Sequence, residues 1–204
     1  LRRGFSVDFI KQVPSNPQEE EVRGTAYHAP PDLTVILVRH PISQRVLVDS
    51  AAVTIYYPSE ERAIRLPSSG PMGLLFLQAF FRVSESNQGL ERYGFEIRRT
   101  EIRADSLFIE WDPPQPLRSS IESARTVFKD DRLVEMVLFR KEGELLLRAG
   151  FSCYITNEGR QYPMTVELSS YVPEPRTEVY RLSSPLFDRA LPDSILSLRL
   201  PPQV

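Results

Sequence analysis

Apolar and polar residues alternate along most of the chain in short runs that end at prolines or polar turns. In FSVDFIKQV (5–13), Phe5, Val7 and Phe9 share one side of an extended backbone, because successive side chains of a strand point to opposite faces. Further strands are expected at 21–29, 32–40, 44–50, 52–58 and 61–67. The connections between them are too short for parallel neighbours, so these strands should pair antiparallel.

One stretch breaks this pattern. The run GPMGLLFLQAFF (70–81) carries no charge, although 25% of the chain is charged. Pro71 suits the start of a helix, and apolar residues recur at helical spacing from Leu74 to Phe81. We expect one short helix over 72–82 that is apolar on most of its circumference and needs burial on more than one side.

The second half of the chain returns to strands. They are expected at 94–104, 105–114, 122–131, 132–140, 144–156 and 162–173, with one more strand in the tail and a short helix or turn near 185–190. The pattern indicates a mainly β (α+β) fold of about ten or eleven strands in a long antiparallel meander. An incomplete antiparallel barrel with the short apolar helix as a lid would bury both the apolar side of the sheet and the helix. We expect a single domain over 1–204.

Composition narrows the class of protein. The chain has 204 residues, 41% of them hydrophobic, which fits one medium-sized domain with a sizeable core. The net charge of -2 gives no overall attraction to nucleic acid. Cys153 is the one cysteine, so an intrachain disulfide is excluded. No apolar run reaches the roughly 18 to 20 residues of a membrane helix. The chain begins LRRGFSVDF without Met, so we expect a form from which a signal peptide has been removed.

Residues with catalytic or metal-binding chemistry are few. His28 and His40 lie beside proline-marked strand ends, where they could meet across a hairpin. Without an HExxH or paired-cysteine spacing, exposed structural histidines are favoured over a metal site. Cys153, in GFSCYI, is expected as a buried thiol in a strand. No nucleophile elbow, P-loop or GxGxxG occurs, so we expect neither an enzyme nor a cofactor.

Apolar surface remains as the candidate binding site. By alternation, strand residues can line one concave face: Val35, Leu37, Val46, Val48, Ile55 and Tyr57. The expected helix adds Leu74, Phe76, Leu77, Phe80 and Phe81. A curved sheet that its own side chains do not fill leaves an apolar cavity for acyl chains or another hydrophobic ligand. The alternative is that the same residues pack as a closed core, and the residues alone leave both open.

The order of several segments resembles a known family. These segments are FSVDFIKQV, VRGTAYHAPP, HPISQRVLVDSAAVTIYYPSEERAIRLP and GPMGLLFLQAFF. The matching positions are Phe5, Phe9, Gln12, Gly24, Pro30, Pro41, Val48-Asp49 and Tyr56-Tyr57-Pro58, and the later NEGRQYPMTVELSSY agrees more loosely. Over about residues 5–81, the chain resembles the LolA-like periplasmic carriers of outer-membrane lipoproteins and the related LolB-like acceptors.

The resemblance implies an incomplete barrel, closed by helices, that binds lipoprotein acyl chains without covalent chemistry. It implies a monomer in the periplasm or cell envelope that transports or sorts lipoproteins between membrane-bound donor and acceptor proteins, with a lipid anchor left open. The helix over 72–82 would form part of the lid. The sequence departs from the family at Ala29-Pro30, where the carriers have an Arg-Pro whose arginine controls the closed state and cargo transfer.

Two rival functions remain. One is a structural or signalling interaction domain of the cell envelope with the same fold, a filled core and no lipid cargo. Its partner surface would include the arginine-lined hairpin at 94–104. The other is an enzyme, which would require a serine, a histidine and a carboxylate to converge near His28 or His40.

Overall fold

The computed structural model describes residues 3–14, 21–29, 33–49, 52–67, 90–91 and 94–196. The helix expected over 72–82 lies outside these residues. The same holds for five candidate site residues, which are Leu74, Phe76, Leu77, Phe80 and Phe81.

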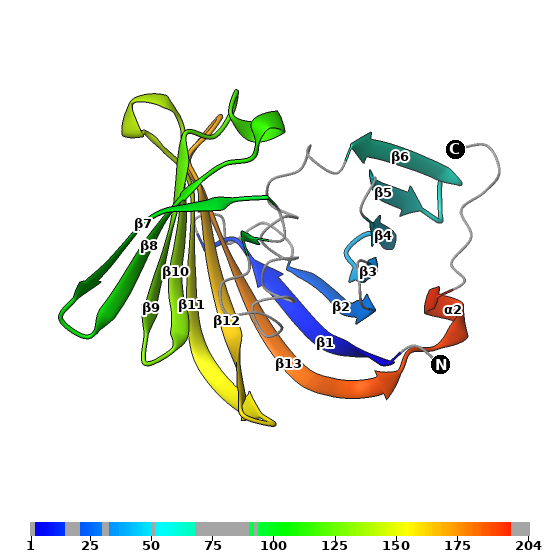
Figure 1. Ribbon diagram of the computed structural model, residues 1–204. Helices are drawn as coiled ribbons and strands as arrows, with labels where there is room; N and C mark the ends of the chain where they lie inside the picture. Colours follow the sequence, from blue (N-terminus) through cyan, green and yellow to red (C-terminus); the bar gives the residue numbers. More distant parts are fainter. Residues whose placement is uncertain are drawn as a thin grey trace. The chain divides into compact units, whose positions relative to one another are not determined.

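The described chain forms thirteen strands of one antiparallel sheet (Figure 1). The first six are β1 (Arg3–Gln12), β2 (Val22–Ala29), β3 (Leu33–His40), β4 (Gln44–Val48), β5 (Ala52–Tyr57) and β6 (Arg62–Pro67). The others are β7 (Glu96–Arg103), β8 (Ser106–Asp112), β9 (Ser123–Lys129), β10 (Arg132–Phe139), β11 (Leu145–Asn157), β12 (Arg160–Ser170) and β13 (Arg176–Ala190). Their order is β6-β5-β4-β3-β2-β1-β13-β12-β11-β10-β9-β8-β7, so the sheet begins and ends at different strands and does not close. The expected mainly β fold with an incomplete antiparallel barrel is confirmed, with thirteen strands in place of ten or eleven.

The strands fall into two compact units. Unit 1 holds β1 to β6 and β13 from Arg181 onward, and unit 2 holds β7 to β12 and β13 up to Tyr180. Within each unit, strands that follow each other in sequence pair with each other. This is the arrangement that short connections impose.

The tail differs from the expectation. The segment 185–190 is the end of strand β13, and the short α-helix α2 follows only at Asp193–Leu196. Two 3-10 turns, η2 (Gln115–Leu117) and η3 (Lys141–Gly143), complete the described helical structure. None of the described helices has both the length and the apolar character that a membrane crossing requires.

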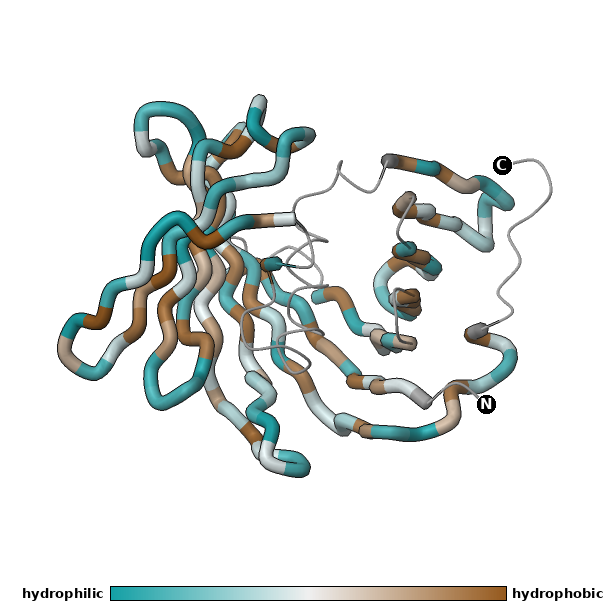
Figure 2. Tube along the Cα trace, viewed as in Figure 1, coloured by the Kyte–Doolittle hydropathy of each residue, from teal (hydrophilic) through white to brown (hydrophobic). Residues whose placement is uncertain are grey.

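Unit 2 has one apolar face and one charged face. A row of directly paired residues across β7 to β12 makes up the centre of the apolar face: Thr100, Ile109, Thr126, Met136, Ala149 and Leu168. Trp111 is fully buried beside this row, and its Nε1 donates a hydrogen bond to Thr126 Oγ1 at 2.9 Å. The alternation of hydrophobic and hydrophilic residues along these strands is visible in Figure 2. Trp111 is therefore part of the core of unit 2.

Candidate functional site

The candidate ligand-binding residues that the structure describes lie on β3, β4 and β5. The set comprises the buried Val35, Val46 and Val48 and the half-buried Leu37, Ile55 and Tyr57. Their place on neighbouring strands agrees with the sequence pattern. Their role in binding stays a prediction.

The register of the sheet divides this set between two faces. Residues directly opposite each other in antiparallel strands point to the same face. Val46 lies opposite Ile36 and Ile55, whereas Val35 lies opposite Leu47. One face therefore holds Val35 and Leu37, and the other holds Val46, Val48, Ile55 and Tyr57. The expectation that all six line one face is wrong, because alternation fixes sides within a strand and leaves the pairing between strands open.

We call the face that carries Val46 the apolar face of unit 1. Its first row of directly paired residues is Val7, Ala26, Ile36, Val46, Ile55 and Ile64. Its second row is Phe5, His28, Thr34, Val48, Val53 and Leu66. Along the first row, the exposed fraction rises from 1% at Val7 to 7% at Val46 and 38% at Ile64. This row is therefore buried at β1 and becomes accessible at β6.

Strand β1 contributes to this face more than the candidate set anticipated. Phe9 lies opposite Gly24, and its ring lies against the β2 backbone. A Cβ atom on Gly24 would fall 2.7 Å from Phe9 Cζ and would also collide with the carbonyl oxygen of Leu37. Gly24 is therefore needed because the ring and the backbone approach closely at this point. The alternation of Phe5, Val7 and Phe9 was the sequence signal for these residues.

His28 also lies on the apolar face, in the second row. It is 2% exposed, and its Nδ1 lies 3.0 Å from the Oγ1 of Thr34, which is 1% exposed. The expectation of an exposed histidine is wrong here. Thr34, on the neighbouring strand β3, provides a hydroxyl as a hydrogen-bond partner for the imidazole of His28. This hydrogen bond compensates for the loss of water around the buried ring. His40 is exposed and pairs with Arg23 at the other end of the β2–β3 hairpin, so the two histidines do not meet.

The opposite face of unit 1, which we call the mixed face, combines apolar and charged residues. Its rows are Ser6, Tyr27, Val35, Leu47, Thr54 and Arg65, and Asp8, Thr25, Leu37, Arg45, Tyr56 and Ala63. Thr25 Oγ1 donates a hydrogen bond to Asp8, and Arg39 Nη2 donates to Thr25 Oγ1 at 2.6 Å. The charged groups of Asp8 and Arg39 favour water over an acyl chain at this point, while Thr25, Val35 and Thr54 on the same face are buried.

Among the described residues, no group of three or more His, Cys, Asp or Glu side chains is placed to hold a metal ion. Cys153 is exposed, contrary to the expectation of a buried thiol. Its φ of 56° takes it out of the regular β11–β12 ladder, in which Ser152 pairs with Thr165 and Tyr154 with Pro163. The register is the same on both sides of Cys153, so the irregularity is confined to this one residue, whose side chain is exposed.

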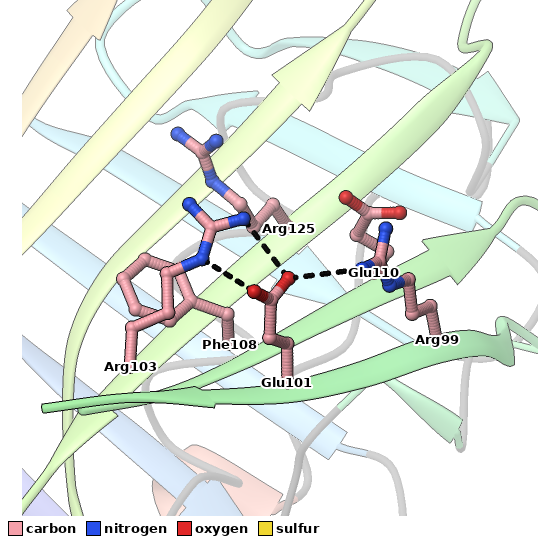
Figure 3. A pocket seen from close by; sticks show the side chains of 6 residues that line it. All are labelled: Arg99, Glu101, Arg103, Phe108, Glu110 and Arg125. Carbon is pink, nitrogen blue, oxygen red and sulfur yellow. Dashed lines mark hydrogen bonds and ion pairs between the residues drawn. The ribbon is translucent and has the colours of Figure 1, made fainter.

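A small hollow lies on the charged face of unit 2 (Figure 3). Its volume is about 30 Å³, and its lining residues are Arg99, Glu101, Arg103, Phe108, Glu110 and Arg125. The Glu101 carboxylate accepts two hydrogen bonds from Arg103, at 2.8 and 2.9 Å, and lies 3.3 Å from Arg99. The hydrogen bond from Arg103 lowers the pKa of the Glu101 carboxyl. This hollow is a surface ion-pair cluster, and its size and charge do not suit an acyl chain.

The described residues therefore define an antiparallel sheet that does not close, with an apolar face on unit 1 whose first row becomes accessible at β6. No protein-family model matches the sequence, and no curated protein matches it by sequence. Solved structures do match the fold. The chain has the LolA-like fold.

Three of the similar structures show how far the likeness extends. A LolA superfamily protein from Nitrosomonas europaea has a TM-score of 0.65 at 16% identity, covering 95% of this chain and 89% of that one. A putative outer membrane lipoprotein-sorting protein domain from Vibrio parahaemolyticus has a TM-score of 0.69 at 17% identity, covering 96% and 90%. A DUF1329 family protein from Desulfovibrio piger has a TM-score of 0.67 at 13% identity, covering 95% and 89%. The resemblance noticed in the sequence is confirmed at the level of the fold.

Proposed function

We propose that this protein binds lipoprotein acyl chains, or a similar hydrophobic ligand, and transports or sorts lipoproteins in the bacterial cell envelope without catalysing a reaction. The ligand passes between this protein and membrane-bound donor or acceptor proteins. The LolA-like fold supports this proposal, since one structure of that fold carries the description of a putative lipoprotein-sorting domain.

The observation that carries the proposal is the gradient of exposure on the apolar face of unit 1. In its first row, Val7 on β1 is buried, whereas Ile55 on β5 is half-buried and Ile64 on β6 is 38% exposed; in its second row, Val53 is buried and Leu66 is half-buried. Apolar side chains that remain accessible next to a packed core offer contact area to a hydrophobic ligand. We therefore place the ligand on this face, against β5 and β6.

Tyr56 and Tyr57 provide a matched pair of variants to test this placement. Both are half-buried tyrosines on β5, but Tyr57 lies on the apolar face and Tyr56 on the mixed face. If an acyl chain covers about 50 Å² of the Tyr57 ring, that contact contributes roughly 1.3 kcal/mol. Tyr57→Ser should then weaken acyl binding about tenfold, whereas Tyr56→Ser should leave it nearly unchanged.

The assay is titration of a fluorescent fatty-acyl probe into each variant, with circular dichroism to verify that each is folded. Equal affinities of the two folded variants would contradict the placement, and so would a loss confined to Tyr56→Ser. Failure of the native protein to bind any acyl probe would contradict the proposed function itself.

A further inference from the structure

Strand β7 lies at one end of the strand order, and within the described part of the chain it pairs with β8 alone. All of its residues are exposed except the half-buried Glu101. Ile97 is 46% exposed, and Ile102, at 76%, is the most exposed of the large hydrophobic residues described. An exposed edge strand presents unpaired backbone groups to which another strand can add.

The sequence of β7, EIRRTEIR, is complementary to itself when read in the opposite direction. We propose that β7 pairs antiparallel with β7 of a second copy of this chain, around a twofold axis at Thr100. The directly opposite pairs are Glu96 with Arg103, Ile97 with Ile102, Arg99 with Glu101 and Thr100 with Thr100, and Arg98 is the bulged residue between two of these pairs. Every charged pair that includes a glutamate then joins opposite charges, and each exposed isoleucine is covered by another.

The β-bulge in β7 makes this register compatible with the faces of the sheet. Ile97 lies opposite Trp111 and Ile102 opposite Leu107, so both isoleucines point to the same face. In a regular strand, residues five apart point to opposite faces. The register shift between Ile97 and Arg99 supplies the extra residue that brings them to one side.

The outer pair of charges also agrees in face. Glu96 lies opposite Asp112 and Arg103 opposite Ser106, which places both on the charged face of unit 2. They can therefore meet across a twofold interface, in which each surface patch contacts its own copy.

Neighbouring registers lack this complementarity. Moving the axis by one residue to Arg99 places Arg99 opposite itself, and moving it to Glu101 places Glu101 opposite itself and Arg99 opposite Arg103. Like charges opposite each other destabilise strand pairing. The charges on β7 therefore disfavour the addition of other strands to this edge. They allow β7 to pair with β7 of a second copy in one register.

The existing ion pairs indicate how strong the contact is. Arg99 already lies 3.3 Å from Glu101, and Glu101 already accepts two hydrogen bonds from Arg103. Because these charges already have partners within one chain, pairing with a second copy gains little binding free energy from them. Their main effect is to favour one register over the others. An interface of one strand pair is also small, so we expect a weak, reversible dimer. This departs from the monomer that the sequence led us to expect.

Sedimentation velocity over a concentration series reaching the millimolar range tests the proposal. The native chain should shift from monomer toward dimer. Arg103→Glu places two glutamates opposite each other, and Glu96→Arg places two arginines opposite each other. Each single variant should raise the dissociation constant of the dimer about tenfold or more, because both symmetric contacts become repulsive.

Two further samples separate pairing of β7 from other effects of charge. The double variant with Glu96→Arg and Arg103→Glu restores opposite charges and should dimerise as the native chain does. An equimolar mixture of the two single variants should also dimerise, because each heterodimer pairs Glu with Arg at both contacts.

A matched apolar control uses two exposed isoleucines. Ile102→Ser should weaken the dimer, whereas Ile42→Ser, at a 52% exposed residue outside β7, should not. The proposal is overturned if the native chain stays monomeric throughout. It is equally overturned if the single charge variants dimerise like the native chain, or if neither the double variant nor the mixture recovers dimerisation.

Discussion

The hydrogen bond between Trp111 and Thr126 should contribute measurably to the stability of unit 2. Both side chains have no exposed surface, and Nε1 lies 2.9 Å from Oγ1. Thr126→Val keeps the shape of the side chain but removes the acceptor, so the indole N–H is left buried without a partner. Such a loss costs about 1 to 3 kcal/mol. For a chain of this size, each kcal/mol corresponds to about 2 to 4 °C in Tm, so Tm should fall by roughly 2 to 12 °C.

Urea unfolding followed by the fluorescence of Trp111, the one tryptophan of the chain, provides the assay. Thr126→Ser is the matched control, because it keeps the hydroxyl and removes one buried methyl group. Emission of the native state should shift to the blue in Thr126→Val and stay unchanged in Thr126→Ser, since only the valine removes the hydrogen bond. A Thr126→Val protein with native stability and native emission would refute this reasoning.

Two further predictions concern the close packing of unit 1 and the tyrosines. Gly24→Ala should lower the free energy of unfolding by about 1 to 3 kcal/mol, because the new Cβ collides with Phe9 and the Leu37 backbone; Gly150→Ala, where nothing lies within 4 Å, should change it by about 0.5 kcal/mol or less. Calorimetry of both variants would contradict this account if Gly24→Ala were the milder change. Burial raises the pKa of Tyr154 and of Tyr180 above the ordinary tyrosine value of 10.0. Because the unfolded chain then releases these protons first, the stability they contribute is complete below pH 10 and is lost as pH rises above it. Chemical unfolding across this range should show a shallower decline in Tyr154→Phe and Tyr180→Phe, and an unchanged slope in both variants would argue against the assignment.

The strands were predictable because their signal is local. Alternation and the turn sequences between strands locate β1 to β12 to within a few residues. The end of β13 was missed because Ser183, Ser184 and Pro185 read as a break in a strand. In the structure, Ser184 has a φ of 51° and the strand continues past it to Ala190. An irregular residue within a long strand leaves no signal that separates it from a turn.

The candidate site was less predictable because it depends on how strands pair. Alternation showed that Val35 and Leu37 point to the same side of β3. Whether they share a face with Val46 and Val48 of β4 depends on the register between the two strands. The burial of His28 likewise depends on Thr34, which reaches it from the next strand. Pairing between strands is set by contacts across the sheet, which a local pattern does not contain.

The central claim is that this chain carries a hydrophobic ligand, and native mass spectrometry of the purified protein tests it most directly. Denaturing extraction and lipid analysis of the same sample would identify what is bound, and an acylated peptide would be added to any unliganded protein. The account predicts a co-purified acyl ligand, or saturable uptake of the acylated peptide that Tyr57→Ser weakens. A mass without ligand and no uptake of the acylated peptide by the folded protein would contradict it.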